Sequence, residues 1–411
     1  MSIFALNPDQ PGYMSEAFQR VLNPIETARG LPNRIYTDNG AHDFECAHVL
    51  TRGWACIGFQ KDIPNPGDAF PVDFAGHPLL MVHGRDGEIR VFHNVCRHRG
   101  RILVDEPAHL KSAIVCGYHC WTYALDGQLI GAPHVGGVGK HDCAGFDKAN
   151  IRLQVVPNAI WMGMVFADLS GRAAPFHDFI APLRERWRDF DGVPLVHTGG
   201  DSTITFDLAC NWKLAVENYC EAYHLPWVHP ELNRYSPLDK HTPIVEPMYS
   251  GQISECYSPD FPEGAPAFPN LPGLPPYWDT GAEYVALFPN VLLGVHRDHF
   301  FAGLILPDGP AGTHERFELF YFDDAVSGDE YAPSRAANRT LWESVFAEDR
   351  DAVEAMQRGR RSSGFDGGVF SPVMDPPTHV FNMWIARAWM DAGRNAASPS
   401  DTTHRIERDR A

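Results

Sequence analysis

Apolar and polar positions alternate in short runs through the first half of the chain. Residues 13–28 have the pattern of a short helix, and from about residue 40 to 170 brief apolar runs are separated by turn signals such as Asn65-Pro66-Gly67-Asp68. Short apolar runs bounded by Gly, Pro, Asn and Asp are typical of strands. The pattern therefore predicts a small all-β unit over residues 40–170, with runs at 58–59, 79–82, 89–92 and 160–166 as strands.

The second half mixes longer helical patterns with strands. Helices are predicted at 176–190, 211–224 and 332–360, and strands at 203–209, 284–306 and 315–323. The Pro-rich stretch 258–276 indicates a long loop, and the polar residues after Asp391 indicate a disordered tail. We predict an α+β protein with an N-terminal segment (1–39), an all-β domain (40–170), a mixed domain (171–390) and a polar tail (391–411).

The amino-acid composition bears on which classes of partner the protein binds and on its cellular compartment. The 34 basic and 52 acidic residues give a formal net charge of −18, which disfavours nucleic acid and anionic membrane surfaces. The longest apolar-rich stretch, about 159–169, is too short to span a bilayer. The 9 Cys are an odd number, and only two have motif spacing, so we expect the others to be free and reduced. These features predict a cytoplasmic protein without a nucleic-acid or membrane partner.

Two Cys–His pairs are the strongest chemical signal. Cys96-Arg97-His98 is followed by Cys116-Gly117-Tyr118-His119. A Rieske [2Fe–2S] cluster has two His in place of two Cys on one iron, so each pair would give one ligand to each iron. A structural zinc site also uses two Cys and two His, but usually as a Cys pair followed by a His pair. The mixed pairs favour the Rieske interpretation.

A second candidate metal site follows in the segment 211–229. His224 and His229 are separated by Pro226, which is expected to interrupt a helix, so His224 is predicted at a helix end and His229 just beyond it. Two His and one carboxylate form the facial triad of non-haem Fe(II) oxygenases. Two His at this spacing are more often unrelated groups. The pair is a stronger signal here, because a one-electron carrier encoded upstream could supply electrons to an oxygen-activating iron.

Together these motifs resemble the Rieske non-haem iron oxygenases, specifically their α (oxygenase) subunits, over roughly residues 15–390. The resemblance implies an all-β Rieske domain and a catalytic domain with a curved antiparallel sheet covered by helices. It implies a [2Fe–2S] cluster, a mononuclear Fe(II) and O₂ as co-substrate. It also implies an Asp ligand from a C-terminal helix, which we place at Asp349, with Asp351 as the second choice. These acids could instead belong to a solvated helix face.

The resemblance further implies a carboxylate that links the two metal centres across a subunit boundary. The matching residue is Glu221, three positions before His224, and Asn218 on the same segment is a candidate supporting residue. A carboxylate hydrogen-bonded to a ligand His on each side would perform this role. The alternative is an ordinary surface acid. The resemblance also implies a homotrimer and an NAD(P)H-dependent reductase of the flavin or ferredoxin type.

Glu221 preceded by Cys220, together with Leu287-Phe288-Pro289-Asn290, is similar to the branch that oxidises quaternary ammonium compounds. That branch includes glycine betaine, choline, stachydrine and carnitine monooxygenases. A quaternary ammonium is recognised by aromatic faces through cation–π attraction, and a carboxylate-bearing betaine needs donors as well. Most aromatic residues will be ordinary core, but the candidates for substrate contact are Tyr219, Trp227, Trp278, Tyr284, His296 and His299.

The expected activity is an O₂-dependent monooxygenase that N-demethylates a betaine and releases formaldehyde. Three alternatives stay open. An aromatic-ring dioxygenase would share the metals, and a carnitine-type enzyme would cleave a C–N bond and release trimethylamine. A Rieske electron carrier would have no working iron at His224 and His229.

Overall fold

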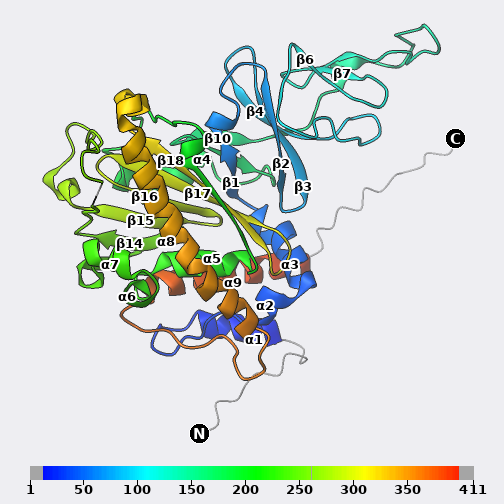
Figure 1. Ribbon diagram of the computed structural model, residues 1–411. Helices are drawn as coiled ribbons and strands as arrows, with labels where there is room; N and C mark the ends of the chain where they lie inside the picture. Colours follow the sequence, from blue (N-terminus) through cyan, green and yellow to red (C-terminus); the bar gives the residue numbers. More distant parts are fainter. Residues whose placement is uncertain (1–12, 261, 398–411) are drawn as a thin grey trace.

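Residues 54–168 form a compact group of antiparallel sheets, as the strand pattern predicts. The computed structural model describes residues 13–260 and 262–397 (Figure 1). The sheets have the strand orders β1-β11-β10, β5-β2-β3-β4-β9 and β6-β7-β8. Their strands are β1 (Trp54–Phe59), β2 (Asp68–Phe74), β3 (His77–His83), β4 (Ile89–His93), β5 (Ala108–His109), β6 (Ala113–Val115), β7 (Thr122–Ala124), β8 (Leu129–Gly131), β9 (Val155–Val156), β10 (Asn158–Trp161) and β11 (Met164–Asp168).

The second half is built on one antiparallel sheet of seven strands in the order β12-β18-β17-β16-β15-β14-β13. Helices α5 (Trp212–Cys220), α8 (Ala332–Gly359) and α9 (Pro376–Ala397) lie over one face of it (Figure 1). This arrangement confirms the predicted fold class. The strands are β12 (Thr203–Leu208), β13 (His241–Val245), β14 (Tyr249–Ser254), β15 (Ala282–Leu287), β16 (Val291–Val295), β17 (His299–Pro307) and β18 (Thr313–Tyr321).

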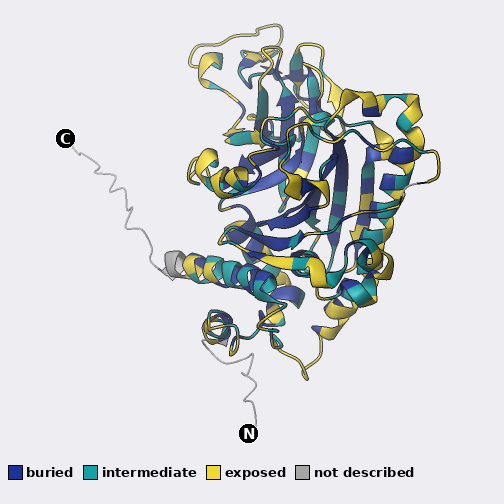
Figure 2. Ribbon diagram, turned by 90° about the vertical axis from the view of Figure 1, so that its left-hand side faces the viewer, coloured by how far each residue is buried: buried dark blue, intermediate teal, exposed yellow. Residues whose placement is uncertain are grey.

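The central strands of this sheet are buried on both faces, which explains their continuous apolar runs (Figure 2). Leu292 packs into the cluster beneath the helices, whereas its neighbour Leu293 packs into a second cluster that contains residues of β1, β11 and α4 (Phe176–Arg186). Asn290 strengthens this junction, because its side chain accepts from Cys56 N at 3.0 Å and donates to Cys56 O at 2.8 Å. The all-β unit is thus anchored to the back of the seven-stranded sheet.

The described part of the N-terminal segment is helical and packs on the unit built on the seven-stranded sheet. Helix α1 (Tyr13–Val21) contacts α9, and Leu31 N donates to the Asn382 side chain at 3.0 Å. The predicted helix over 13–28 is too long, because the chain turns at Pro24. Two further helices follow, α2 (Arg34–Thr37) and α3 (Asn39–Glu45).

Residues 39–50 are helical, so the prediction that strands begin near residue 40 is wrong. The Asp38 side chain accepts from Ala41 N at 2.9 Å and caps α3, and a π-helical turn over Cys46–Leu50 continues it. The helix was not predicted, because the turn-rich sequence does not show that the Asp38 side chain caps it.

Most predicted elements of the second half are present, with two differences. Helix α4, strand β12 and the long helix α8 lie where they were predicted. The helix predicted over 211–224 stops at Cys220, because Glu221 is extended. The tail prediction is wrong for residues 391–397, which belong to α9, and residues 398–411 lie outside the described residues. Across residues 13–260 and 262–397, we find no helix with the length and apolar content that a bilayer crossing requires.

Candidate metal centres

Two matched loops present the Cys–His pairs of the all-β domain. In the first, Cys96 N donates to Arg101 O at 2.8 Å and Gly100 N donates to Cys96 O at 3.0 Å. In the second, Cys116 N donates to Trp121 O at 2.8 Å and Cys120 N donates to Cys116 O at 3.0 Å. The residue four positions after the first Cys of each loop, Gly100 or Cys120, has a positive φ of 73° or 54°. The two loops therefore have the same backbone design.

The thiols and imidazoles of these loops occupy different depths. Cys96 and Cys116 are 3% and 2% exposed, and Cys96 Sγ lies 3.3 Å from Tyr123 Oη. Burial and the neighbouring Cys96 raise the pKa of Tyr123.

His98 is exposed, and its ring lies 4.7 Å from that of His119, between centroids. The Nδ1 atom of His119 is buried without a hydrogen-bond partner. Two buried thiols beneath two outer imidazoles, one of each from each loop, fit a Rieske cluster.

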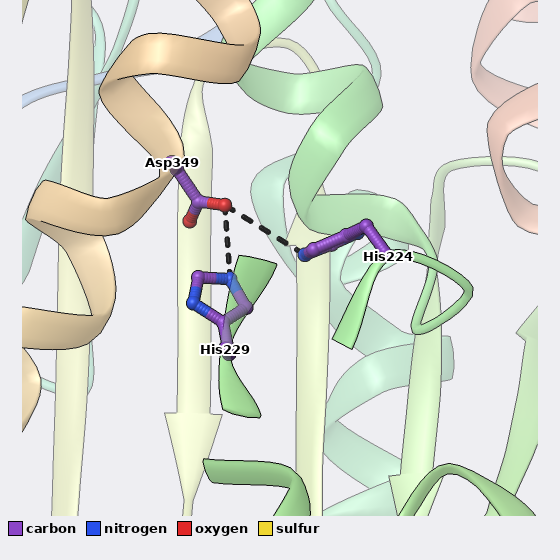
Figure 3. A group of neighbouring side chains, drawn as sticks. All are labelled: His224, His229 and Asp349. Atoms are coloured by element: carbon purple, nitrogen blue, oxygen red, sulfur yellow. Dashed lines mark ion pairs between the residues drawn. The ribbon is translucent and has the colours of Figure 1, made fainter. Parts of the chain in front are cut away.

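The second centre brings together His224, His229 and Asp349 (Figure 3). Their ligand atoms all lie within 4.8 Å of one another. Asp349 Oδ1 is 2.9 Å from His229 Nε2 and 3.7 Å from His224 Nε2. The same oxygen is buried without a hydrogen bond of good geometry. An unsatisfied carboxylate oxygen that faces two imidazole nitrogens fits the facial triad of a mononuclear iron.

Proline residues produce the spacing of the two histidines. Helix α6 (Leu225–Val228) has Pro226 in its first turn, and α7 (Pro230–Tyr235) begins at Pro230. Pro is well tolerated at these positions, because the first amides of a helix have no partner inside it. His224 precedes α6, and His229 lies between α6 and α7. The prediction that Pro226 interrupts a helix is wrong, because α5 already ends at Cys220 and Pro226 lies in the first turn of the next helix, α6.

Each histidine is oriented by a second carboxylate. His224 Nδ1 lies 2.7 Å from Glu221 Oε1, and His229 Nδ1 lies 2.8 Å from Glu348 Oε2. These contacts fix the tautomer in which Nδ1 carries the proton and Nε2 is free to bind a metal. Burial opposes the charged form, but Asp349 and Glu348 raise the pKa of His229 overall. The role of Glu348 was not predicted, although it directly precedes Asp349 on α8.

The structure also shows where the other predicted site residues lie, namely Asp351, Glu221 and Asn218. Asp351 is exposed and is not part of the group that faces the histidines, so the structure brings Asp349 to them instead. Glu221 accepts from the backbone amides of Tyr223 and His224 as well as from the His224 ring. Asn218 is half-buried and lines the cleft beside the triad.

A small cleft opens beside the triad. Two of the predicted substrate residues, Tyr219 and Tyr284, line it, and Tyr219 Oη donates to Leu293 O at 2.8 Å. None of the described residues that line this cleft is Lys or Arg. They are Asn218, Tyr219, His224, Leu225, His229, Leu232, His241, Gln252, Tyr284, Trp342, Val345, Phe346 and Asp349.

The other predicted substrate residues lie elsewhere. Trp227 is 72% exposed and packs on Tyr223, outside the cleft lining. Trp278 is buried in the cluster behind the sheet, against Phe190. His296 and His299 are buried behind the cleft wall, where Tyr284 Oη lies 3.2 Å from His296 Nε2. Trp342 and Phe346, which line the cleft, were not predicted, because they lie on α8 among ordinary core residues.

Each of the two units matches a known protein family. Residues 53–142 match the Rieske [2Fe-2S] domain, and residues 197–391 match the ring hydroxylating alpha subunit (catalytic domain). The first range contains the two Cys–His loops, and the second contains the His224, His229 and Asp349 group.

Curated relatives act on several related compounds. The chain is 28% identical to the glycine betaine monooxygenase oxygenase subunit of Chromohalobacter salexigens, over 88% of this chain and 91% of that protein. It is 27% identical to the chloroplastic choline monooxygenase of Arabidopsis thaliana, over 87% and 82%. It is also 27% identical to the carnitine monooxygenase oxygenase subunit of Escherichia coli K12, over 84% and 87%.

Solved structures share the fold. The quaternary ammonium Rieske monooxygenase CntA superimposes with a TM-score of 0.74 at 22% identity, over 90% of this chain and 98% of that one. Naphthalene 1,2-dioxygenase from Rhodococcus gives a TM-score of 0.70 at 19% identity, over 94% and 99%. The resemblance found in the motifs is thus confirmed. The chain belongs to the Rieske non-haem iron oxygenases as an α-type oxygenase subunit, whose cofactors are a Rieske [2Fe–2S] cluster and a mononuclear iron that uses O₂.

Proposed function

We propose that this protein is a monooxygenase that N-demethylates a betaine of the glycine betaine or proline-betaine type. Cys96, His98, Cys116 and His119 would hold the cluster, and His224, His229 and Asp349 would hold the iron. Electrons would come from NAD(P)H through a separate flavin and iron–sulfur reductase. We also propose a cytoplasmic location and a division of the chain into a Rieske domain over 40–170 and a catalytic domain over 171–390.

The observation that carries this proposal is the aromatic wall beside the triad. The rings of Tyr219, Tyr284, Trp342 and Phe346 line the cleft, and its described lining has no basic side chain. A quaternary ammonium cannot donate an N–H hydrogen bond, so aromatic faces are its natural partners. A Lys or Arg would repel it. The glycine betaine, choline and carnitine relatives support the same substrate class.

The positions of the two metal centres support electron transfer between subunits. In Figure 1 the Rieske loops around β6 and β7 project at the upper right, whereas α6 and α7 lie at the lower left. We propose that a homotrimer places the cluster of one subunit against Glu221 of the next. Glu221 has a half-buried side chain and already accepts from His224. A histidine that ligates the neighbouring cluster could donate to its other side.

The proposed reaction consumes one O₂, two electrons and two protons, and yields water and an N-hydroxymethyl product. Iron in the triad would bind and reduce O₂ with the electrons that the cluster supplies. The aromatic wall orients one N-methyl group toward the triad, and Glu221 and Glu348 keep the ligand histidines in place. The N-hydroxymethyl product then breaks its C–N bond, which releases formaldehyde and the demethylated amine.

The test is formaldehyde release during NADH-driven turnover with a generic Rieske reductase. The panel contains glycine betaine, proline betaine, hydroxyproline betaine, choline and carnitine. We expect formaldehyde in a one-to-one ratio with O₂ uptake for one betaine. Trimethylamine from carnitine would overturn the proposal in favour of a carnitine-type enzyme. No formaldehyde from any member of the panel, with the cluster reduced and the iron loaded, would overturn it in favour of carnitine-type cleavage or an aromatic substrate. An iron content of two rather than three atoms per chain would indicate an electron carrier.

A further inference from the structure

A buried glutamine in the cleft wall holds the backbone of Glu221. Gln252 is 8% exposed and lines the cleft beside the triad, and its Nε2 donates to Glu221 O at 3.2 Å. Within residues 13–260 and 262–397, no other donor reaches this carbonyl. Glu221 is extended and directly follows α5, where the carbonyls at a helix end lack partners inside the helix. Gln252 therefore fixes the point at which the backbone leaves α5.

The register of the sheet brings His241 to the same place. His241 on β13 pairs with Ser254 on β14, two residues after Gln252, and Gln252 pairs with Tyr284 on β15. Paired residues and alternate residues of a strand point to the same face of a sheet. The side chains of His241 and Gln252 therefore lie on the face where Tyr284 packs beneath the helices, and all three line the cleft.

Hydrogen-bond chemistry fixes the orientation of the Gln252 amide. A carbonyl oxygen can only accept, so the Gln252 atom that faces Glu221 O is Nε2, and Oε1 faces His241 Nδ1 at 2.6 Å. His241 Nδ1 therefore carries a proton and donates. Burial lowers the pKa of His241, so the ring is neutral at pH 7 and Ser236 Oγ donates to its Nε2 at 3.0 Å. Ser236, His241, Gln252 and Glu221 thus form a series in which each group donates to the next.

Glu221 extends this series to the iron site through its side chain. Its Oε1 accepts from His224 Nδ1 at 2.7 Å, and its Oε2 accepts from the backbone amides of Tyr223 and His224. Groups that hydrogen-bond to a metal ligand fix the orientation of its ring. Gln252 is therefore two steps from His224, because its amide holds the Glu221 backbone and the Glu221 carboxylate holds the His224 ring.

We propose that Gln252 is a positioning residue of the iron site, which acts on His224 through Glu221 and whose amide is oriented by His241. The proposal rests on the proposed function in one respect, the assignment of His224 as an iron ligand. It adds two residues that neither belong to the ligand set nor contact a ligand histidine by a hydrogen bond. Because Gln252 also lines the cleft, it connects the space for substrate with the acid proposed to link the two metal centres.

The test is a double-mutant cycle on the Kd for Fe(II) of the full chain, measured by competition with a chelator, without reductant or substrate. Gln252→Met keeps the length of the side chain and removes both of its hydrogen bonds. We expect the Kd to rise about threefold to tenfold, since a neutral hydrogen bond that supports His224 through Glu221 is lost. Glu221→Ala alone should raise the Kd about tenfold to a hundredfold. Added to Glu221→Ala, Gln252→Met should have no further effect.

Ser250→Ala is the matched control. Ser250 is buried two residues before Gln252 on the same face of β14, but its hydroxyl donates to Pro377 O at 2.8 Å. This variant should keep the wild-type Kd for Fe(II), even if its Tm falls. An unchanged Kd in Gln252→Met overturns the positioning role. An equal rise in both backgrounds, or in Ser250→Ala, also overturns it, because the effect is then a general loosening of the strand.

His241→Leu gives a second test that leaves Gln252 in place. The amide loses the donor that orients it, so we expect the Kd for Fe(II) to rise about twofold to threefold, again only while Glu221 is present. This variant decides the matter if Gln252→Met does not fold. A wild-type Kd in His241→Leu would then overturn the proposal.

The proposed function can fail separately from the positioning role. If iron affinity depends on Gln252 through Glu221 but no quaternary amine releases formaldehyde, the positioning role stands and the proposed reaction is wrong. If the wild-type chain demethylates a betaine and its iron affinity does not depend on Gln252, only the positioning role is wrong.

Discussion

The two metal centres are prepared by different parts of the chain. At the cluster site, backbone hydrogen bonds shape two equivalent loops that place Cys96 and Cys116 beneath His98 and His119. At the iron site, the side chains of two carboxylates position the histidines, and they come from the extended residue after α5 and from α8. The first centre depends on local loop conformation. The second also needs contacts between residues far apart in the sequence, because Glu348 and Asp349 on α8 reach the histidines of the segment 224–229.

This difference predicts how each centre responds to substitution. Side-chain changes at the iron site remove a ligand or release a histidine, so they should reduce iron binding or turnover while leaving the cluster intact. Changes to the loop backbone should act on the stability of the Rieske domain and leave the iron unaffected. A variant that disturbs both centres equally would contradict the separation.

The largest effect is expected from Asp349→Ala. Among the described residues, Asp349 is the only carboxylate that faces both His224 and His229, so without it the mononuclear iron should be lost and turnover abolished. The brown cluster should remain. Iron analysis and the visible spectrum of the purified variant measure both outcomes. Asp351→Ala is the control, because that side chain is exposed on the same helix, and full iron and activity in Asp349→Ala would rule out its role as ligand.

Glu221→Gln should slow electron transfer between the centres without emptying either one. The amide oxygen can still accept from His224 Nδ1, but the negative charge that would bridge to a neighbouring cluster is lost. We expect turnover to fall about tenfold to a hundredfold, as for other residues that support a metal ligand. Single-turnover oxidation of the reduced cluster measures this rate.

The control for Glu221 is Glu231→Gln on α7, whose exposed side chain pairs with Arg234. The Glu231→Gln variant should oxidise its reduced cluster at the wild-type rate. A native rate in Glu221→Gln would remove the bridging role and leave Glu221 as a positioning residue for His224.

A smaller effect is expected from Glu348→Ala. His229 loses the acceptor for its Nδ1 proton, so its ring is no longer held with Nε2 toward the iron. Because the Glu348 side chain is 38% exposed, water can replace part of this contact, and we expect iron affinity to fall about tenfold. Competition with a chelator measures the affinity. The Glu348→Gln variant keeps an acceptor oxygen but loses the negative charge. Wild-type iron affinity in this variant would show that Glu348 acts by orienting the His229 ring and not through its charge.

Both centres could be predicted from the sequence to the extent that their ligands lie close together along the chain. The Cys–His pairs and the His224–His229 segment are local motifs, so their positions were evident. Asp349 is distant in sequence and was identified only through the family resemblance. Glu348 was not predicted, because a hydrogen bond across the fold, rather than a local pattern, gives it its role.

The smallest effect concerns the cluster loops and compares Cys120 with Gly100. Both residues occupy the equivalent loop position with positive φ, but only glycine adopts this conformation without strain. Cys120→Gly should therefore raise the free energy of unfolding of the Rieske domain by about 0.5–1 kcal/mol, after the added flexibility of the unfolded chain is subtracted. Thermal unfolding followed at the cluster absorption measures this change.

Gly100→Ala tests the same argument in the opposite direction. A Cβ at this position meets only Val95 Cγ1 at 3.9 Å, an ordinary contact, so any loss of stability comes from the backbone conformation and not from a clash. We expect a loss of about 1 kcal/mol with the cluster retained. If the two substitutions shift the unfolding temperature in the same direction, loop strain does not govern the Rieske site. In that case the claim that the backbone shapes the cluster site would fail, and only the claim that side chains shape the iron site would remain.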